Sequence, residues 1–196
     1  PHAADYRFTS LRKTIAAPDG GLVRSGHLLP TSKGKNTFSP YKLKGALIKG
    51  AADQTAADRE YLALFEQGEA LIEDNYDSEM SGEASAILAA TDLDDAANRR
   101  RKNARYLTTK LEEIGIRPLL KCEGNQVPLF VPILIDNRDE VRRELRKNGI
   151  FCPVHWPLRN DMAGLAMGKL MAERELSLII DQRYGQEDMD SIIEVL

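Results

Sequence analysis

The sequence predicts an α/β protein in which the end of one sheet is followed by long helices and then by a small α+β domain. Three observations predict this class. Strand patterns separated by turn residues occupy the first forty residues, apolar residues recur at helical spacing between residues 41 and 115, and short strands and helices mix from residue 116 onward. This mixture is typical of helices packed on one face of a small mixed sheet.

The front of the chain predicts a strand, a tight turn and a returning strand. Tyr6–Leu11 and Gly21–Ser25 have strand composition, and Ala17–Gly21 joins them with a proline that presets φ and two glycines that permit positive φ. Pro30–Lys35 has loop composition. Because the chain lacks an initiating Met and only four residues precede Asp5, we expect these strands to be the last part of a sheet in a longer protein.

Two helical regions are predicted between residues 41 and 115. In the first, apolar residues between Tyr41 and Ile72 recur at spacings of three, four and their sums, with interruptions near Gly50 and Gly68. In the second, Glu83–Ile114, apolar residues again share one face, and Gly115 ends the helix.

The basic run Arg99–Lys102 lies on the second helical region. A nucleic-acid patch is one interpretation of such a run. Because Asp92, Asp94 and Asp95 lie one to two turns upstream, we expect a solvated face with ion pairs instead.

The remainder of the chain predicts short strands and helices. Asp139–Asn148 is expected to form a helix that ends at Gly149, and Gln186–Leu196 places its apolar residues on one face of a closing helix. The other expected elements are strands over Val127–Ile135, Ile150–Val154 and Leu176–Ile180 and a helix over Ala163–Glu173.

The composition excludes several kinds of protein. The 196 residues include 27 Lys and Arg against 30 Asp and Glu, a net charge of −3, so bulk charge does not bind the chain to nucleic acid. The longest apolar run, Val127–Ile135, is much shorter than the about 20 residues that span a membrane. Two cysteines, Cys122 and Cys152, are too few for a disulfide framework and indicate a cytoplasmic protein.

Common catalytic motifs are absent, because the sequence has no Walker A pattern, no Gly-x-Gly-x-x-Gly and no Gly-x-Ser-x-Gly. Cys152 and His155 are close together, which leaves open a metal site, a thiol hydrolase or a buried structural cysteine. Two ligands are too few for a metal, and residues three apart on a strand face opposite sides. We therefore expect a structural cysteine.

The segment Phe8–Thr14 is the most distinctive candidate site. It places Lys13 on a hydroxyl-rich turn after a strand. A lysine amine becomes a nucleophile where burial or a neighbouring cation lowers its pKa, and Arg12 is adjacent in the sequence. Neighbouring hydroxyl and backbone N–H groups could hold a phosphate. An ordinary surface loop is the alternative.

Three segments resemble one family in the correct order. Phe8–Val23 resembles the lysine segment of the DegT-type sugar aminotransferases, which are fold-type-I pyridoxal-phosphate enzymes. Asn98–Leu111 resembles the interdomain helix of that family, and Gly149–Leu158 its small-domain substrate segment. Leu176–Leu196 looks like its closing strand and helix. The resemblance covers the whole chain but only the second half of a family member.

The resemblance implies an organisation for this chain. The parent would have the α/β fold of fold-type-I transferases, with residues 1–40 as the end of the large cofactor-binding domain, 41–115 as connecting helices and 116–196 as the small α+β domain. It also implies pyridoxal 5′-phosphate as cofactor, and a homodimer. The family's phosphate-binding loop, ring-stacking aromatic residue and acid for the pyridine nitrogen all precede the lysine.

The resemblance also implies roles for single residues. Lys13 would form the Schiff base with the cofactor and move the substrate proton. Ser10 and Thr9 would bind the cofactor phosphate, and Asn36 would reach the cofactor phosphate of a partner subunit. His155 and Trp156 would contact the substrate.

Departures from the family pattern are local. Most members have Ser-Phe-His-x-x-Lys and then Gly-Glu-Gly-Gly, whereas this chain has Ser-Leu-Arg-Lys and then Pro-Asp-Gly-Gly. A dehydratase branch has histidine in place of the lysine, so Lys13 favours amino transfer.

Two functions are therefore expected from different classes. The first is the C-terminal part of an aminotransferase that moves an amino group from a donor such as glutamate to a keto acceptor, with a nucleotide sugar as one possible acceptor. The second is a non-catalytic interaction or dimerisation module that lacks the cofactor-binding half.

Overall fold

The computed structural model describes residues 4–51, 57–155 and 164–196. The chain divides into two compact units, Pro1–Thr91 and Asp92–Leu196. The helices predicted over residues 41–115 are thus divided between the units. In the described ranges, no helix is both long enough and apolar enough to cross a membrane.

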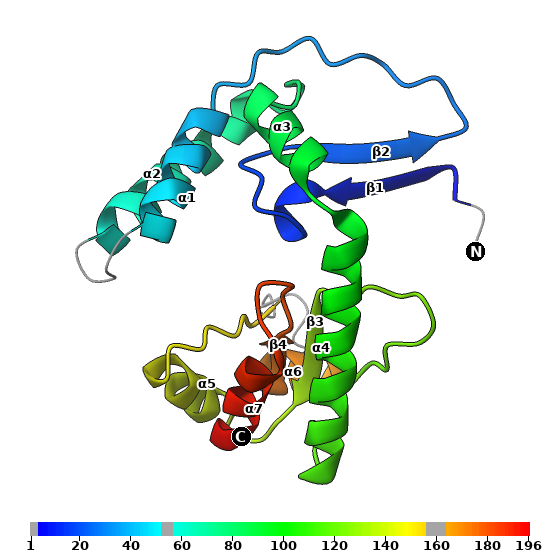
Figure 1. Cartoon of the computed structure of the whole chain (residues 1–196), viewed down its shortest axis with the longest axis vertical. Coiled ribbons are helices and arrows are strands. Elements are labelled where there is room, and N and C mark those ends of the chain that lie inside the picture. The colour runs from blue at the N-terminus through cyan, green and yellow to red at the C-terminus, as the bar shows by residue number, and fades with distance from the viewer. Residues whose placement is uncertain (1–3, 52–56, 156–163) are drawn as a thin grey trace. The chain divides into compact units, whose positions relative to one another are not determined.

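The first unit begins with an antiparallel hairpin of β1 (Tyr6–Ser10) and β2 (Gly21–Ser25), which confirms the predicted strand, turn and returning strand (Figure 1). Phe8 lies opposite Val23 in its register. A 3-10 turn, η1 (Leu11–Lys13), follows β1 directly. Gly20 has a φ of +95°, a conformation that favours glycine, so the chain can enter β2 at this point.

A small hydrophobic cluster lies under the η1 turn. Leu11, Ile15 and Ala17 pack against Ala84 of helix α3 (Gly82–Ala90), and all four are buried. Asp19 is buried beside them, and its Oδ1 accepts a hydrogen bond from the backbone N–H of Ser81 at 3.0 Å. Apolar packing and a hydrogen bond at the start of α3 therefore both hold the turn that carries Lys13.

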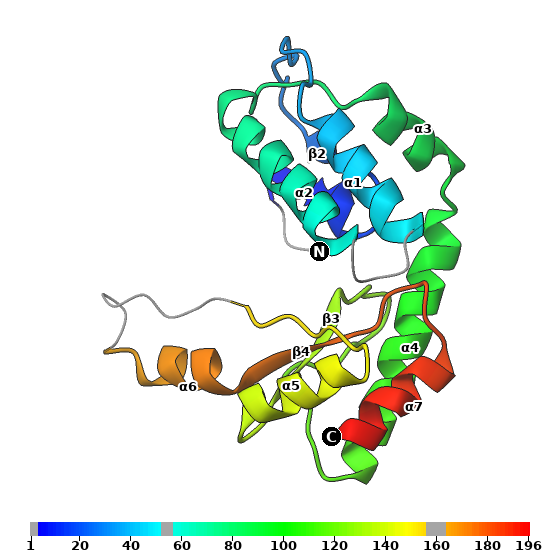
Figure 2. The ribbon, with the colours of Figure 1, turned by 90° about the vertical axis from the view of Figure 1, so that its left-hand side faces the viewer.

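Helices α1 (Ser39–Ala51) and α2 (Ala57–Asp74) lie side by side in the first unit (Figure 2). Lys42 of α1 is buried, and its ammonium lies 5.9 Å from the centre of the Phe65 ring. A Cβ on Gly68 would come within 2.9 Å of the Lys42 side chain. The predicted interruption at Gly68 is wrong, because this glycine lies inside α2 and makes room for Lys42.

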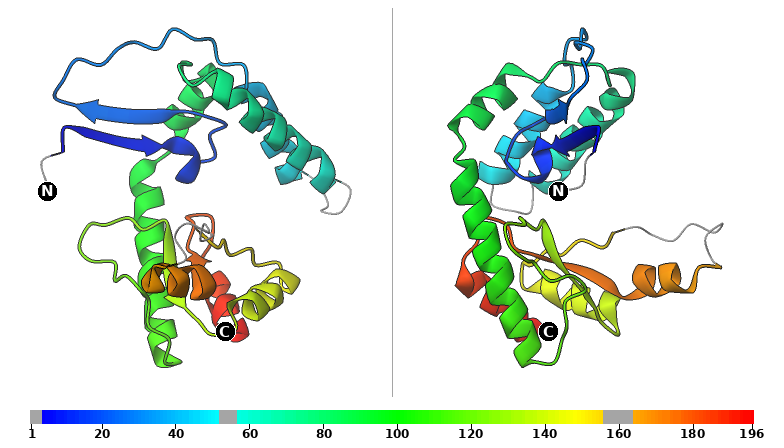
Figure 3. Two further views of the ribbon diagram at one scale, coloured as in Figure 1. Left: turned by 180° about the vertical axis from the view of Figure 1, so that it is seen from behind. Right: turned by 90° about the vertical axis from the view of Figure 1, so that its right-hand side faces the viewer.

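The second unit is built on an antiparallel pair, β3 (Phe130–Leu134) and β4 (Glu175–Ile179), in which Pro132 lies opposite Ser177. The remaining elements are the helices α4 (Leu93–Glu113), α5 (Arg138–Lys147), α6 (Ala166–Arg174) and α7 (Gln186–Val195). Figure 3 shows α4 and α7 in this unit, where they pack against each other.

Alternation along β3 and β4 creates the core of the second unit. One face of the pair is fully buried and packs on apolar side chains of α4, α5 and α7. The strand residues of this face are Val131, Ile133, Leu176 and Leu178, and the main helix residues are Leu107, Leu111, Leu145, Met189 and Ile192. The other face carries Phe130, Pro132, Glu175 and Ser177.

Two predicted elements differ from the structure. The helix predicted over Glu83–Ile114 is two helices, because Asp92 caps α4, with its Oδ1 accepting from Asp95 N–H at 2.9 Å. The strand predicted over Ile150–Val154 is not formed. Pro153 has no N–H to donate to a ladder, although its carbonyl accepts from Ser177 N–H at 3.2 Å.

The solvated, ion-paired face predicted for Arg99–Lys102 is confirmed for Arg99, which pairs with Asp95 at 3.2 Å, but is wrong for Arg100. Arg100 is 4% exposed, and burial lowers the pKa of its guanidinium whereas the Asp181 carboxylate raises it. The guanidinium donates to three acceptors, which are the side chains of Gln182 (2.7 Å) and Asp181 (3.2 Å) and the carbonyl of Leu129 (3.3 Å). Arg100 therefore ties α4 to the residues that precede β3 and follow β4.

Candidate functional site

The first candidate site is the turn that carries Lys13. Lys13 is the last residue of η1 and is exposed, and its ammonium makes no hydrogen bond or ion pair with any residue that the structure describes. Ser10 lies at the N-cap position of η1, but its hydroxyl does not cap the turn. Thr9 is exposed on β1. An amine and two hydroxyl groups are thus available on consecutive elements.

Arg12, the cation next to Lys13 in the sequence, pairs with an acidic residue of α2. Its guanidinium donates to Glu69 Oε1 of α2 at 2.8 Å, and the Lys42 ammonium pairs with the same oxygen. The hydrogen bond from Lys42 is the main cause that lowers the pKa of the Glu69 carboxyl; burial opposes it, and Arg12 adds to it. Glu69 is shared by the two cations, so it offsets the positive charge of Arg12 only in part.

Asn36 is used within the first unit. Its Oδ1 accepts from the backbone N–H of Ser39 at the start of α1 at 2.9 Å, and its Nδ2 donates to the carbonyl of Glu79 at 3.3 Å. Both amide atoms therefore fasten the loop before α1. A cofactor phosphate would have to compete with these bonds.

The second candidate site surrounds His155 in the second unit. His155 Nδ1 lies 3.1 Å from Ser177 Oγ, and Ser177 Oγ donates to Glu175 Oε1 at 2.5 Å. The backbone N–H of His155 donates to the other Glu175 oxygen at 3.3 Å. The imidazole also packs against the Phe130 ring, with 5.0 Å between the ring centres. Trp156, predicted with His155, lies outside the described residues.

A pocket of about 390 Å³ lies along β3 and the residues that precede it, and His155 itself is not among its lining residues. Its wall is mainly apolar, and Phe130 and Ser177, both of which contact His155, take part in it. The other lining residues are Thr108, Leu120, Lys121, Cys122, Gln126, Val127, Pro128, Leu129, Val131 and Pro132. An apolar wall with a few polar groups is typical of a site for a small molecule.

Sequence reasoning selected His155 but not its partners. Glu175 and Ser177 lie 20 and 22 residues further along the chain. A signal was available, because residues two apart on a predicted strand share one face of a sheet. Nothing in the sequence pairs that face with His155.

Cys152 is a structural cysteine, as the sequence predicts. It is 2% exposed within the core, and burial raises the pKa of its thiol. The His155 imidazole is bonded to Ser177 and not to the thiol. Among the described residues, no cluster of His, Cys, Asp and Glu could hold a metal ion.

A thiol-directed probe is expected to label Cys122 in the native chain and to leave Cys152 unmodified. Cys122 is partly exposed, whereas Cys152 is buried and its raised pKa lowers the thiolate fraction. Peptide mass spectrometry after a timed reaction measures both sites. Both should react in denaturant, and equal rates in the native chain would contradict the buried placement.

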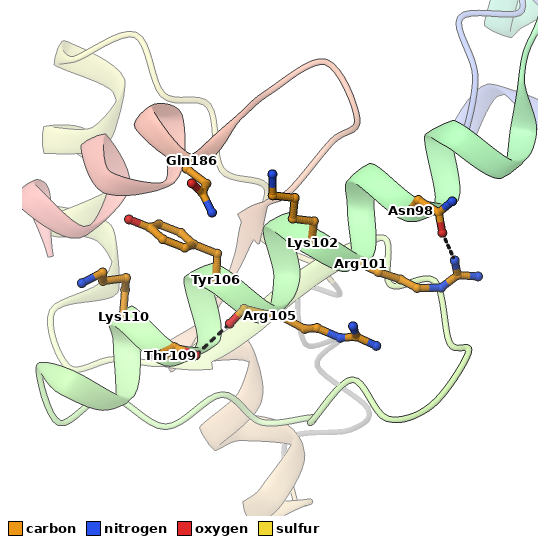
Figure 4. A pocket seen from close by; sticks show the side chains of 8 residues that line it. All are labelled: Asn98, Arg101, Lys102, Arg105, Tyr106, Thr109, Lys110 and Gln186. Carbon is orange, nitrogen blue, oxygen red and sulfur yellow. Dashed lines mark hydrogen bonds between the residues drawn. The ribbon is translucent and has the colours of Figure 1, made fainter.

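A second pocket, of about 400 Å³, lies along α4 (Figure 4). Arg101 and Arg105 are held there by backbone carbonyls, at 3.3 Å from Asn125 and 3.5 Å from Gly124. The other lining residues are Asn98, Lys102, Tyr106, Thr109, Lys110 and Gln186, the first residue of α7. Its basic residues are Arg101, Lys102, Arg105 and Lys110, so only two residues of the run Arg99–Lys102 line it.

Tyr106 in this pocket is expected to ionise at a higher pH than an ordinary tyrosine. Its hydroxyl donates to Asp190 at 2.7 Å, and this hydrogen bond is the main cause that raises the pKa of Tyr106. The ultraviolet titration difference between the wild-type chain and Tyr106→Phe isolates this group. Asp190→Asn should lower its pKa, and an unchanged titration would contradict the contact.

Comparisons with known proteins place this fold. No family model matches the sequence, and no curated protein does. A DegT DnrJ EryC1 StrS aminotransferase from Brucella abortus is similar over 97% of this chain and 50% of its own, with a TM-score of 0.57 and 19% identity. DesI, solved in the presence of its TDP-sugar product, is similar over 97% of this chain and 48% of its own, at 0.56 and 18%.

A third solved structure agrees over a smaller part. The putative sugar aminotransferase Spr1654 from Streptococcus pneumoniae, in its apo form, covers 58% of this chain and 33% of its own, with a TM-score of 0.50 and 23% identity. The chain thus spans about half the length, or less, of the structures it matches. These likenesses show the fold, which is that of part of a fold-type-I aminotransferase, as the sequence predicted.

Proposed function

We propose that this chain supplies the C-terminal half of a pyridoxal-phosphate-dependent aminotransferase. The observation that carries the proposal is the Lys13 turn. Its lysine amine follows a strand and has no partner among the described residues, and the buried cluster of Leu11, Ile15 and Ala84 holds the turn itself in place. Two aminotransferases of similar fold, matched over 97% of this chain, support it.

The residues of the turn suit the cofactor in part. Lys13 would hold it through its amine, and the hydroxyls of Ser10 and Thr9 would bind its phosphate, since Ser10 is not consumed by capping. Asn36, which the resemblance assigns to the cofactor phosphate of a partner subunit, suits phosphate binding less well, because both of its amide atoms are already bonded. When bound, pyridoxal phosphate supplies the electron sink for amino transfer. Lys13 would then move the proton at the substrate carbon.

The hairpin beside Lys13 presents an apolar face that suits a larger domain. Phe8 is 85% exposed, and its cross-strand neighbour Val23 is also exposed. In the proposal, the rest of the cofactor-binding domain packs on this face. That packing would exclude water from the turn and complete the cofactor site.

The substrate classes follow from the proposed reaction. We propose glutamate or a similar amino acid as the donor and a keto compound as the acceptor. A keto sugar carried by a nucleotide is the acceptor that we favour, because DesI, of similar fold, was solved with a TDP-sugar product. We also propose a homodimer that works in the cytoplasm.

A single-turnover assay tests this function. The protein, in the form that its gene encodes, is loaded with pyridoxal phosphate and mixed with glutamate, without a keto acceptor. The expected result is one 2-oxoglutarate for each bound cofactor. Cofactor binding without formation of the matching 2-oxo acid, from glutamate or from any other amino acid, would contradict amino transfer.

A non-catalytic interaction module is the second candidate, and the exposed hairpin face favours it. A short hairpin with apolar residues on its surface invites association. Light scattering of the 196-residue chain should then show association that Phe8→Ser abolishes. A monomer at all concentrations would count against this candidate.

A further inference from the structure

We infer that Glu175 acts through Ser177 to hold His155 in the tautomer that carries its proton on Nδ1, so that Nε2 serves as a hydrogen-bond acceptor for a ligand. Glu175 and Ser177 are then positioning residues. The contact of His155 with a ligand rests on the proposed function, together with the substrate contact that the family resemblance implies for His155.

The inference follows from counting protons. A carboxylate only accepts hydrogen bonds, so Ser177 must donate its single hydroxyl proton to Glu175. The distance of 2.5 Å is that of a charge-assisted O–H···O bond. With its proton committed, Ser177 can meet His155 Nδ1 at 3.1 Å only as an acceptor. Nδ1 must therefore carry a hydrogen.

The surroundings of the three groups keep this arrangement in place. Ser177 is 3% exposed, so solvent has little access to its hydroxyl. Glu175 also accepts the backbone N–H of His155, and the Phe130 ring packs on the imidazole. Backbone, ring face and one ring nitrogen of His155 are all fastened to the β3–β4 pair.

The remaining ring nitrogen determines which ligand group is bound. Nε2 makes no hydrogen bond with the described part of the chain. In the neutral ring it offers a lone pair, which takes a donor such as a hydroxyl or an ammonium. A sugar hydroxyl or the amino group of an amino donor fits this acceptor, whereas a carboxylate or phosphate does not. The mainly apolar pocket that Phe130 and Ser177 help to line, the two side chains that contact His155, would hold the carbon skeleton.

Nitrogen NMR of the histidine rings tests the inference directly. The chain has three histidines, and the spectrum of His155→Gln assigns the His155 signals. At about pH 9 an ordinary imidazole, with a pKa near 6.5, is neutral. We expect a protonated Nδ1 and an unprotonated Nε2 on His155. A dominant Nε2–H form in the wild-type chain would overturn the inference.

Two variants test whether the hydrogen bonds of Glu175 and Ser177, and not packing alone, set the tautomer of His155. In Glu175→Ala the Ser177 hydroxyl is free to donate to Nδ1, so the dominant tautomer should change to Nε2–H. Ser177→Ala removes the relay and should also reduce the Nδ1–H form, which keeps the test decisive if the first variant does not fold. Ser191→Ala on the exposed side of α7, where the hydroxyl bonds only its own helix, should change nothing.

The measurement needs neither cofactor nor turnover. An unchanged tautomer in a folded Glu175→Ala chain would overturn the relay whatever the reaction is. Failure of the amino-transfer assay would leave the relay intact. The two failures are therefore distinguishable.

Discussion

Replacing Lys13 with Ala is expected to lower the rate of single-turnover amino transfer by about 10⁴-fold or more. One positioned proton-transfer group contributes about 10² to 10⁴ in rate, and Lys13 is proposed to hold the cofactor as well. The measurement is the rate of 2-oxoglutarate formation from glutamate by the cofactor-loaded protein. Lys13→Arg should also fail, because guanidinium is not a usable base or nucleophile.

Lys35→Ala is the matched control for this loss. Lys35 is an exposed lysine in the loop before α1 of the same unit, and within the described ranges its backbone carbonyl alone is bonded, by Ser78 Oγ at 3.5 Å. The control should retain the full rate. If Lys13→Ala were as active as Lys35→Ala, the catalytic assignment of Lys13 would be contradicted.

Arg100→Ala is expected to destabilise the second unit by about 2–4 kcal/mol. It removes a buried guanidinium, takes away its hydrogen bonds to the Gln182 and Asp181 side chains, and removes the Arg100 donor of the Leu129 carbonyl. The lost stability is expected to be smaller than for a buried ion pair in which one charge is left alone, because Asp181 still pairs with Arg183 at 2.8 Å. Urea unfolding, monitored through hydrogen exchange of the α4 amides, measures this change in the free energy of unfolding.

The neighbouring Arg99→Ala is the control for position and charge. The Arg99 side chain is 58% exposed and pairs with Asp95 at 3.2 Å, a surface pair that contributes less than about 1 kcal/mol. Arg100→Met retains most of the side-chain volume but none of the hydrogen bonds. Comparing it with Arg100→Ala therefore separates the effect of the lost hydrogen bonds from the effect of the lost packing. Equal effects of Arg99→Ala and Arg100→Ala would contradict the buried network.

The sequence predicted those elements whose formation depends on turn residues and on the spacing of nearby apolar residues. The hairpin was predictable because Pro18, Gly20 and Gly21 encode its connection, and Gly20 indeed has positive φ. The helix α5 was predictable from its apolar spacing and from Gly149, which has a φ of +75°. The hairpin connection and the end of α5 both depend on residues that are close together in the sequence.

Long-range contacts were not predictable from the same patterns. Arg100 belongs to a basic run, and only the fold brings Asp181 and Gln182 to it, 81 and 82 residues further along the chain. Gly68 looked like a helix interruption because the partner that needs its space, Lys42, lies on another helix. In both cases a tertiary contact overrides the local signal.

The candidate sites show the same division. Lys13 became a candidate through contiguous strand, turn and hydroxyl residues together with the family resemblance, whereas the pairing of Arg12 with Glu69 joins residues 57 positions apart. His155 was recognisable by resemblance, but its hydrogen-bond partners come from β4. What surrounds a side chain, and so what it can do, depends on the fold.

Borohydride trapping tests the central claim most directly. The protein, in the form that its gene encodes, is loaded with pyridoxal phosphate and reduced, which makes the bond between cofactor and lysine permanent. Peptide mass spectrometry then identifies the modified residue. The account predicts the pyridoxyl group on Lys13, with none on Lys35. A label on another lysine, or no label on a protein that binds the cofactor, would contradict it.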